Sequence, residues 1–329
     1  MTEMAQLEPL TDTPATASAA GRRHLIGIAD LTAADVERLL GTAATISRSL
    51  EREVKKLPAL RGRLVVNLFY ESSTRTLSSF DLAAKRLSAD TMALRSSGSS
   101  VDKGESLKDT ALTLAEYDPD VIVIRHPHIG APQLVAKATR ARVVNAGDGK
   151  HQHPTQALLD LYTMRESLGR LEGLHVAIVG DVLHSRVARS LIEALALVDA
   201  RTTLVAPPTL IPRGIEAMGC EVSSDMATIA AADVVYVLRM QQERMLPGAA
   251  YVPSLREYAA EWGVAPERLR RGQVVMHPGP MNRGVEIDPR VADSGASLIT
   301  EQVRSGLVVR MAVLYDLLVG GAAASLEVE

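Results

Sequence analysis

The sequence predicts an α/β protein with two domains, each a mostly parallel doubly wound sheet flanked by helices. Its 329 residues leave room for two domains of ordinary size. Short apolar runs alternate with segments of helical periodicity, which is typical of a sheet covered by helices on both faces. The first candidate strand begins at residue 64, and the others lie at 91–94, 121–124, 143–144, 174–179, 203–206, 234–238 and 274–276.

The first strand leads through a polar turn into a helix. Leu77, Phe80, Ala84 and Leu87 recur three or four positions apart, and Ser73 stands where an N-cap belongs. The unpaired N–H groups and the positive dipole at such a helix start favour an anion. The segment therefore predicts a phosphate site. An equally good interpretation is that the hydroxyls merely cap the helix and that the side chain of Arg75 is solvated.

Further helical patterns cover residues 30–53, 106–117 and 298–318. Another helix opens at Pro154, because proline suits the first turn, and its apolar face predicts that it crosses between the domains. Just before it, the run Asn-Ala-Gly-Asp-Gly at residues 145–149 predicts a turn.

Composition and charge narrow the class of protein. A hydrophobic share of 47%, a charged share of 23% and a net charge of -3 describe a globular chain whose main partner is not nucleic acid. The one cysteine, Cys220, cannot form an internal disulfide, which predicts a reducing, cytoplasmic location. Residues 1–22 lack the apolar core of a signal peptide and are interpreted as a disordered tail. No apolar run reaches the ~18 residues that a membrane helix requires.

Polar and cationic residues follow the predicted strands, at the sheet edge where ligands gather in folds of this kind. Cations, amides and imidazoles prevail there, which suits an anionic substrate with several oxygens. These strand-end segments are residues 73–76, 125–127, 151–156, 180–186, 239–244 and 277–280.

Two other kinds of site are less consistent with these residues. His126 with His128, or His151 with His153, could bind a metal, but no acidic or thiolate group stands at a useful spacing, so we expect neither a metal nor a cofactor. The segment that starts at Gly180 resembles the opening of a dinucleotide site. The glycines required two and five positions later are absent, which argues against nicotinamide binding.

Residues 69–76, Phe-Tyr-Glu-Ser-Ser-Thr-Arg-Thr, are similar to the carbamoyl-phosphate signature of the aspartate and ornithine carbamoyltransferase family. Three features resemble the aspartate enzymes more than the ornithine enzymes: Glu71 in place of Lys, Arg239 with Gln241, and the run His-Pro-Gly-Pro at 277–280. The resemblance covers about residues 23–320 and includes the segments 103–110, 125–127, 145–149, 153–160 and 239–244.

The resemblance implies a carbamoyl-phosphate-binding domain at residues 23–154, with the C-terminal helix 298–320 packed back on it, and an aspartate-binding domain at 155–297. In the family, the segment at the helix start holds the phosphate, and a glutamine with the main-chain carbonyls of the 277–280 loop holds the carbamoyl group. The residues so implied for carbamoyl phosphate are Ser73, Thr74, Arg75, Thr76, Ser99, Arg125, His153, Gln156, Pro278 and Gly279.

The same resemblance implies a homotrimer in which Ser99 and Lys103 reach into each site from a neighbouring subunit. It assigns the two carboxylates of aspartate to Arg186 and Arg239, supported by Gln241 and Lys103, whereas the local pattern alone leaves open a solvated helix face for Arg186. The residues implied as catalytic are Arg75, Thr76, Lys103, Arg125 and His153.

The implied activity is transfer of a carbamoyl group to the α-amine of aspartate, in pyrimidine synthesis. Fixed hydrogen-bond donors would stabilise the charge on the carbonyl oxygen and then on departing phosphate, with no metal and no covalent enzyme intermediate. Ser73 would be a phosphate ligand and not a nucleophile. Alternatives are transfer to ornithine and an inactive scaffold or regulatory subunit. The sequence leaves open whether a regulatory chain or a dihydroorotase binds.

Overall fold

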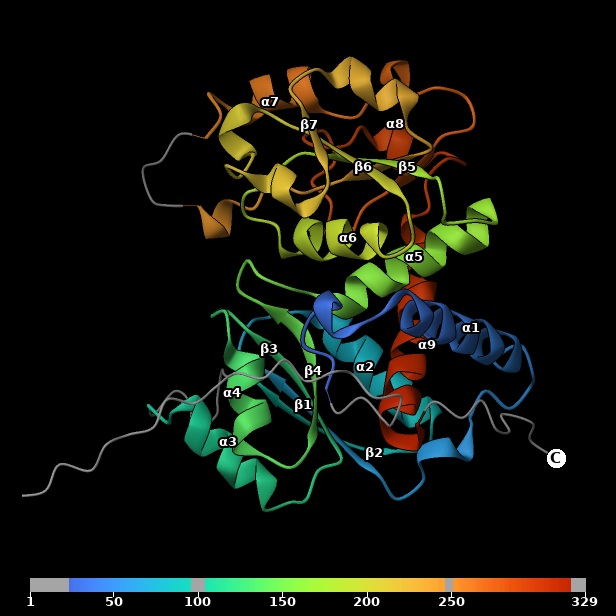
Figure 1. Cartoon of the computed structure of the whole chain (residues 1–329), viewed down its shortest axis with the longest axis vertical. Helices are drawn as coiled ribbons and strands as arrows, with labels where there is room; N and C mark the ends of the chain where they lie inside the picture. Colours follow the sequence, from blue (N-terminus) through green and yellow to red (C-terminus); the bar gives the residue numbers. More distant parts are fainter. Residues whose placement is uncertain (1–23, 96–103, 246–250, 321–329) are drawn as a thin grey trace, which may run out of the picture.

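The computed structural model describes residues 24–95, 104–245 and 251–320, which form two β-sheets flanked by helices. Neighbouring strands run parallel throughout both sheets. The two sheets lie in separate lobes (Figure 1). This architecture confirms the fold class predicted from the alternating strand and helix patterns.

The first lobe contains a four-stranded sheet. Its elements are α1 (Ala33–Ser49), β1 (Leu64–Phe69), α2 (Thr74–Arg86), β2 (Asp90–Arg95), α3 (Leu107–Ala115), β3 (Val121–His126), α4 (Ala131–Ala138) and β4 (Arg142–Asp148). The strand order is β2-β1-β3-β4. Val65 on β1 packs into the core shared with α1 and α2, whereas Val66 and Leu68 pack with α3 and α4. Alternate side chains of one strand thus bury both faces of the sheet.

The second lobe contains a five-stranded sheet. Its elements are β5 (His175–Val179), α6 (Arg186–Ala196), β6 (Arg201–Val205), β7 (Glu221–Ser223), β8 (Val234–Val237), α7 (Leu255–Trp262), β9 (Val274–Met276) and α8 (Pro289–Ala292). The strand order is β7-β6-β5-β8-β9. Val176 and Ile178 on β5 pack into the core that includes α6, and Ala177 and Val179 face the opposite cluster. This sheet is therefore also covered on both faces.

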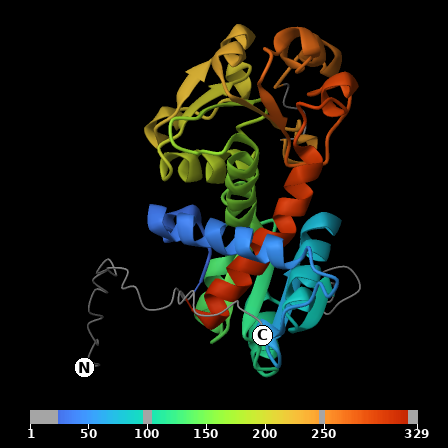
Figure 2. The same ribbon diagram turned by 90° about the vertical axis from the view of Figure 1, so that its right-hand side faces the viewer.

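Two helices, α5 (Pro154–Leu168) and α9 (Ile299–Val319), run between the lobes. Figures 1 and 2 show both helices crossing from one sheet to the other. α9 packs against α1, α2 and α5, and α5 also packs against α6. The predicted crossing of the helix that opens at Pro154 is confirmed, because α5 packs against β4 of the first lobe and against α6 of the second.

Some predicted boundaries were wrong. β4 continues through Asp148, so most of the predicted turn at 145–149 is strand, because pairing with β3 and burial override the turn preference of its residues. The first long helix ends at Ser49 and not at residue 53. Sequence patterns did not predict α4, α7, α8 or β7, which are short elements of three to eight residues.

Among the described residues, no helix is long and apolar enough to cross a membrane. The longest, α9, has 21 residues but carries charged side chains such as Glu301, Arg310 and Asp316. The tail predicted at residues 1–22 lies outside the described residues.

Candidate active site

A cavity of about 580 Å³ opens where the strand ends of the two sheets meet. Its walls come from the C-terminal ends of β1, β3, β8 and β9, from the first turns of α2, α5 and α6, and from α9. The predicted site residues that the structure describes all line this cavity: Ser73, Thr74, Arg75, Thr76, Arg125, His153, Gln156, Arg186, Arg239, Gln241, Pro278 and Gly279. Ser99 and Lys103 lie outside the described residues.

The start of α2 has the features of an anion site. Ser73 is its N-cap and has an extended backbone, but its hydroxyl makes no capping hydrogen bond. The interpretation of Ser73 as a simple cap is therefore wrong, and the hydroxyl is available to a ligand beside the unpaired N–H groups of the first turn. Partial burial is the main cause that lowers the pKa of Arg75, and the positive charge of Arg239 lowers it further. Two cations thus face the same volume, which favours an anion between them.

Gly279 lets Arg75 lie directly against the 277–280 loop. The glycine has a φ of +61°, and a Cβ at this position would lie 2.1 Å from Nη1 of Arg75. Any other residue at 279 would require the guanidinium to move. The loop and the anion site therefore form one wall of the cavity.

The catalytic candidate His153 is buried. Burial, and then the positive charges around it with Arg125 foremost, lower the pKa of His153 well below its usual value, so the imidazole is neutral near pH 7. Its main-chain N–H donates to Oγ of Ser190 at 2.7 Å, and Ser190 donates to Oε1 of Gln152 at 2.7 Å. Glu193 accepts from the Gln152 amide at 2.9 Å. Residues of α6 thus fix the position of His153.

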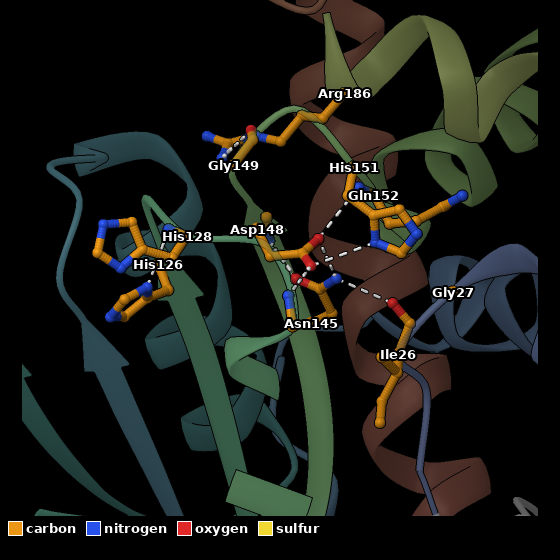
Figure 3. Close-up of polar contacts among 12 residues, drawn as sticks. Ile26, Gly27, His126, His128, Asn145, Asp148, Gly149, His151, Gln152 and Arg186 are labelled. Carbon is orange, nitrogen blue, oxygen red and sulfur yellow. Dashed lines mark hydrogen bonds and ion pairs between the residues drawn. The ribbon is translucent and has the colours of Figure 1, made fainter. Parts of the chain in front are cut away.

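A buried carboxylate, Asp148, organises the turn that leads to His153 (Figure 3). It accepts from Nδ2 of Asn145 at 2.8 Å and from the main-chain N–H of Gln152 at 3.0 Å, and Nδ1 of His151 lies 3.2 Å away. This network explains why β4 continues into the segment predicted as a turn. It also holds the residues before α5 in one conformation.

The histidine pairs do not assemble a metal centre. Nδ1 of His126 accepts the main-chain N–H of His128 at 3.0 Å, and Figure 3 shows this pair apart from His151. Across the described ranges, no group of three or more His, Cys, Asp and Glu side chains could hold a metal ion. The polar groups that line the cavity are mainly arginines, imidazoles, hydroxyls and amides.

Glu71, just after β1, joins arginines from both lobes. Nη2 of Arg125 donates to it at 2.6 Å, Nη2 of Arg244 donates at 3.2 Å, and Arg186 donates through both terminal nitrogens. Burial alone would raise the pKa of Glu71, but the bonds and charges of these arginines, Arg186 foremost, bring it to about 2. Arg186 also donates to the carbonyl of Gly149 at 3.2 Å (Figure 3). Arg186 is therefore a fixed wall residue and not a solvated one.

Arg239 and Gln241, predicted to bind aspartate, stand at the cavity edge beyond β8. Glu243 accepts two hydrogen bonds from the guanidinium of Arg239, one of them at 3.1 Å. The main-chain N–H of Gln241 donates to Oδ2 of Asp181 at 3.0 Å. Glu243 thus orients Arg239, and a substrate carboxylate that binds this guanidinium must share it with Glu243.

Sequence reasoning assigned no role to Glu71, Arg244, Gln302 or Arg310, which also line the cavity. Arg310 is buried, and its Nη1 donates to Oγ of Ser79 at 2.7 Å. Arg310 could have been noticed in the sequence because it interrupts an apolar helical run. An arginine at such a position is rarely buried without a partner. The role of Glu71 depends on arginines far along the chain and has no comparable local signal.

Two family models match the chain. The model described as aspartate/ornithine carbamoyltransferase, carbamoyl-P binding domain, matches residues 23–166. The model described as aspartate/ornithine carbamoyltransferase, Asp/Orn binding domain, matches residues 172–317. Together these two segments contain the strand ends and helix starts that line the cavity.

Curated relatives and solved structures give the same result. The aspartate carbamoyltransferase catalytic subunits of Salinispora arenicola and Acidothermus cellulolyticus are 58% and 55% identical, over 91% of this chain and 98% and 93% of their own lengths. The Trypanosoma cruzi aspartate transcarbamoylase in complex with N-(phosphonacetyl)-L-aspartic acid superposes with a TM-score of 0.82 at 31% identity, covering 93% of this chain and 98% of that one.

The catalytic subunit of M. jannaschii aspartate transcarbamoylase superposes with a TM-score of 0.80 at 34% identity, covering 90% of this chain and 98% of that one. Agreement thus extends from family models over both lobes to whole-chain similarity in sequence and in structure. The chain belongs to the aspartate/ornithine carbamoyltransferase family.

Proposed function

We propose that this chain transfers the carbamoyl group of carbamoyl phosphate to the α-amine of L-aspartate, giving N-carbamoyl-L-aspartate and phosphate, in de novo pyrimidine biosynthesis. The observation that carries the proposal is a single cavity in which the anion site of α2 faces Arg186 and Arg239 from the other lobe. One end suits a phosphate and the other a dicarboxylate. The similar Trypanosoma cruzi enzyme has been solved in complex with carbamoyl phosphate and aspartate.

Ser73, Thr74, Arg75 and Thr76 hold the phosphate in this proposal, and Arg125 joins them from β3. Thr76, Arg125 and His153 polarise the carbonyl group. Because His153 is neutral, its ring can donate a hydrogen bond to the carbonyl oxygen without supplying a proton for transfer. Gln156 and the main-chain carbonyls of the 277–280 loop face the carbamoyl NH₂.

Arg186 and Arg239, with Gln241 beside them, bind the two carboxylates of aspartate and present its α-amine to the carbonyl carbon. Attack forms a tetrahedral intermediate whose oxyanion is stabilised by the fixed donors, and collapse expels phosphate, which takes up the proton that the amine loses. No enzyme nucleophile takes part. The catalytic work is orientation of two anions and stabilisation of developing charge.

The assembly is part of the proposal. We infer a cytoplasmic homotrimer in which Ser99 and Lys103 of one subunit complete the site of the next, with Lys103 near the aspartate. We also place the carbamoyl-phosphate domain at residues 23–154 and the aspartate domain at 155–297. The packing of α9 against α1 and α2 supports assigning residues 298–320 to the first domain.

Release of phosphate from carbamoyl phosphate tests the function. The purified protein is assayed with aspartate, with ornithine and with no acceptor, and the carbamoylated product is identified by mass. We expect aspartate-dependent release with formation of N-carbamoyl-aspartate. Release that requires ornithine, or none above the rate without an acceptor, would refute the proposal.

A further inference from the structure

Asp160 is a buried carboxylate bonded to two residues of the cavity wall, Gln156 and Gln302. Its side chain is inaccessible to solvent, and three side chains donate to it. Nε2 of Gln156 donates to Oδ1 at 3.0 Å, Nε2 of Gln302 donates to the same oxygen at 2.7 Å, and Oη of Tyr236 donates to Oδ2 at 2.7 Å. These donors come from α5, α9 and β8, so one carboxylate joins the two crossing helices to the second sheet.

The chemistry of a carboxylate fixes how both glutamine amides are turned. In its ionised form, which prevails above about pH 7, the Asp160 carboxylate only accepts hydrogen bonds, so both amides then present their NH₂ groups to it and turn their oxygens away. For Gln302 this orientation has an independent check, because its Oε1 accepts the main-chain N–H of His277 at 2.9 Å. For Gln156, which lines the cavity, the same orientation leaves the amide oxygen for a ligand.

The bond to His277 extends the effect to the 277–280 loop. Nδ1 of His277 accepts the main-chain N–H of Gly279 at 2.8 Å, and Nε2 lies 3.2 Å from a carboxylate oxygen of Glu286. The loop is therefore anchored by Gln302 on one side and by Glu286 on the other. Through Gln302, Asp160 supports the segment that carries the carbonyl of Pro278.

Burial of Asp160 carries a cost that packing alone does not require. Loss of solvent raises the pKa of this carboxyl to about 7, even though the hydrogen bonds from Tyr236, Gln302 and Gln156 and the positive charge of Arg310 act in the opposite direction. A buried carboxylate costs stability even when it accepts hydrogen bonds, and an apolar residue in its place is often no less stable. A role in organising the cavity accounts for its presence.

We propose that Asp160 is a positioning residue that makes the carbamoyl subsite a hydrogen-bond acceptor. By accepting from both glutamines at once, it turns the Gln156 amide oxygen toward the cavity and holds the Pro278 carbonyl in place, so that both can accept from the NH₂ of the substrate. This inference rests on the proposed function. It predicts a specific selectivity for NH₂ over CH₃ next to the reacting carbonyl.

Acetyl phosphate tests that selectivity because it replaces the NH₂ of carbamoyl phosphate with CH₃. The measured quantity is the ratio of the Ki of acetyl phosphate to the KM of carbamoyl phosphate, with the Ki of inorganic phosphate as a reference for the anion site. Asp160→Leu should lower the ratio about 10-fold or more, because the amide oxygens lose their fixed orientation, and leave the phosphate Ki within about twofold. Gln302→Leu provides a second lesion should Asp160→Leu fail to fold, and the same fall in the ratio is expected.

Two further variants separate positioning from general destabilisation. Asp160→Asn should largely restore the ratio, because its Oδ1 can accept from both glutamines while its Nδ2 donates to Oη of Tyr236. Thr163→Val, three residues along α5, removes a buried hydrogen bond of 2.7 Å to the Leu159 carbonyl without touching either glutamine, and should leave the ratio unchanged.

The proposal is overturned if the variants weaken carbamoyl phosphate, acetyl phosphate and phosphate in parallel, or if Asp160→Asn loses selectivity as fully as Asp160→Leu. The role of Asp160 is tested only if the wild-type protein is active, and then by the ratio of the Ki of acetyl phosphate to the KM of carbamoyl phosphate in the variants. If the wild-type protein forms no N-carbamoyl-aspartate, the proposed function itself has failed, and this outcome is distinct from failure of the role of Asp160.

Discussion

Arg75 illustrates how much of this site depends on one side chain. It extends from the first turn of α2, contacts the 277–280 loop at Gly279 and shares the cavity with Arg239. The hydroxyl of Ser73 beside it does not cap the helix. The hydroxyl of Ser73 can therefore bind a ligand without giving up a capping hydrogen bond.

Arg75→Ala should lower kcat/KM for carbamoyl phosphate by about 10³, because a doubly charged leaving group loses its bidentate donor at the point where charge develops. The chain should still fold, since Arg75 supports no core contact. Steady-state kinetics with a matched Arg75→Lys variant tests the geometry, because lysine keeps the charge but not the fork and should recover only part of the loss. Activity within about tenfold of wild type in Arg75→Ala would disprove the phosphate role.

The buried carboxyl of Asp160 predicts a pH-dependent stability. Its pKa is about 7 in the folded chain against a reference of 3.8, so the folded state holds a proton that the unfolded state has released between about pH 4 and 7. The stability contributed by this group is therefore lost as the pH rises through that window. Asp160→Asn cannot ionise, so its stability relative to wild type should increase from pH 5 to pH 8.

Urea unfolding midpoints of wild type and Asp160→Asn at pH 5, 6, 7 and 8 measure this change. Asp293→Asn is the control, because a hydrogen bond from Arg283 lowers the pKa of that exposed carboxyl and moves its titration below this pH range. If the urea midpoints of Asp160→Asn and wild type differ by the same amount at all four pH values, Asp160 ionises as an ordinary carboxyl.

At the scale of elements, the site is made by segments that follow strands. β1, β3, β8 and β9 each end at the cavity, and the segment after each strand contributes a different group. The segment after β8 carries Arg239, Glu243 and Arg244, which face the cavity together, with Arg244 paired to Glu71 across the lobes. This segment therefore lines the cavity and joins the two lobes, and in the proposed function it also binds aspartate.

Arg239→Ala should raise the KM of aspartate by about 100-fold or more and change the KM of carbamoyl phosphate by less than about threefold, because only one substrate carboxylate loses its partner. Initial rates with each substrate varied in turn measure the two constants. Arg213→Ala is a control for the loss of one exposed arginine outside the cavity. If both constants rise together, Arg239 acts on the closure of the lobes and not on the carboxylate.

For the whole molecule, the cavity between two lobes explains why catalysis needs both sheets. Glu71 in one lobe holds Arg186 and Arg244 of the other, so the relative position of the lobes and the position of two site arginines are set by one carboxylate. α5 and α9 cross the same junction and carry Gln156 and Gln302. Lobe geometry and substrate geometry are therefore coupled.

The proposed sharing of sites between subunits can be tested by mixing. Lys103→Ala and Arg75→Ala should each be nearly inactive alone. Mixed trimers made from the two should recover activity, because some sites then pair a normal loop from one subunit with a normal phosphate pocket from the next. Reassembled trimers are verified by native mass spectrometry and assayed against each parent treated in the same way. No recovery in verified mixed trimers would assign Lys103 to the site of its own chain.

Local patterns in the sequence determined most of the secondary structure and the composition of the site. Strands appeared as apolar runs, and the functional segments followed them, because parallel strands place their C-terminal ends at one edge. The anion site at residues 73–76 could be predicted since a helix start binds anions through its own backbone. The errors fell where local preference was weak or misleading, as in β4, whose turn-forming residues are buried and paired with β3.

Tertiary structure alone decided how the site residues are held. Glu71 lies 115 residues from Arg186 and 173 from Arg244, and Asp160 lies 142 residues from Gln302. Each of these contacts exists because two sheets and two crossing helices pack in one arrangement, and no spacing in the sequence encodes that arrangement. The sequence therefore named many of the groups that line the cavity, while the fold determined which buried partners orient them and which way their hydrogen bonds point.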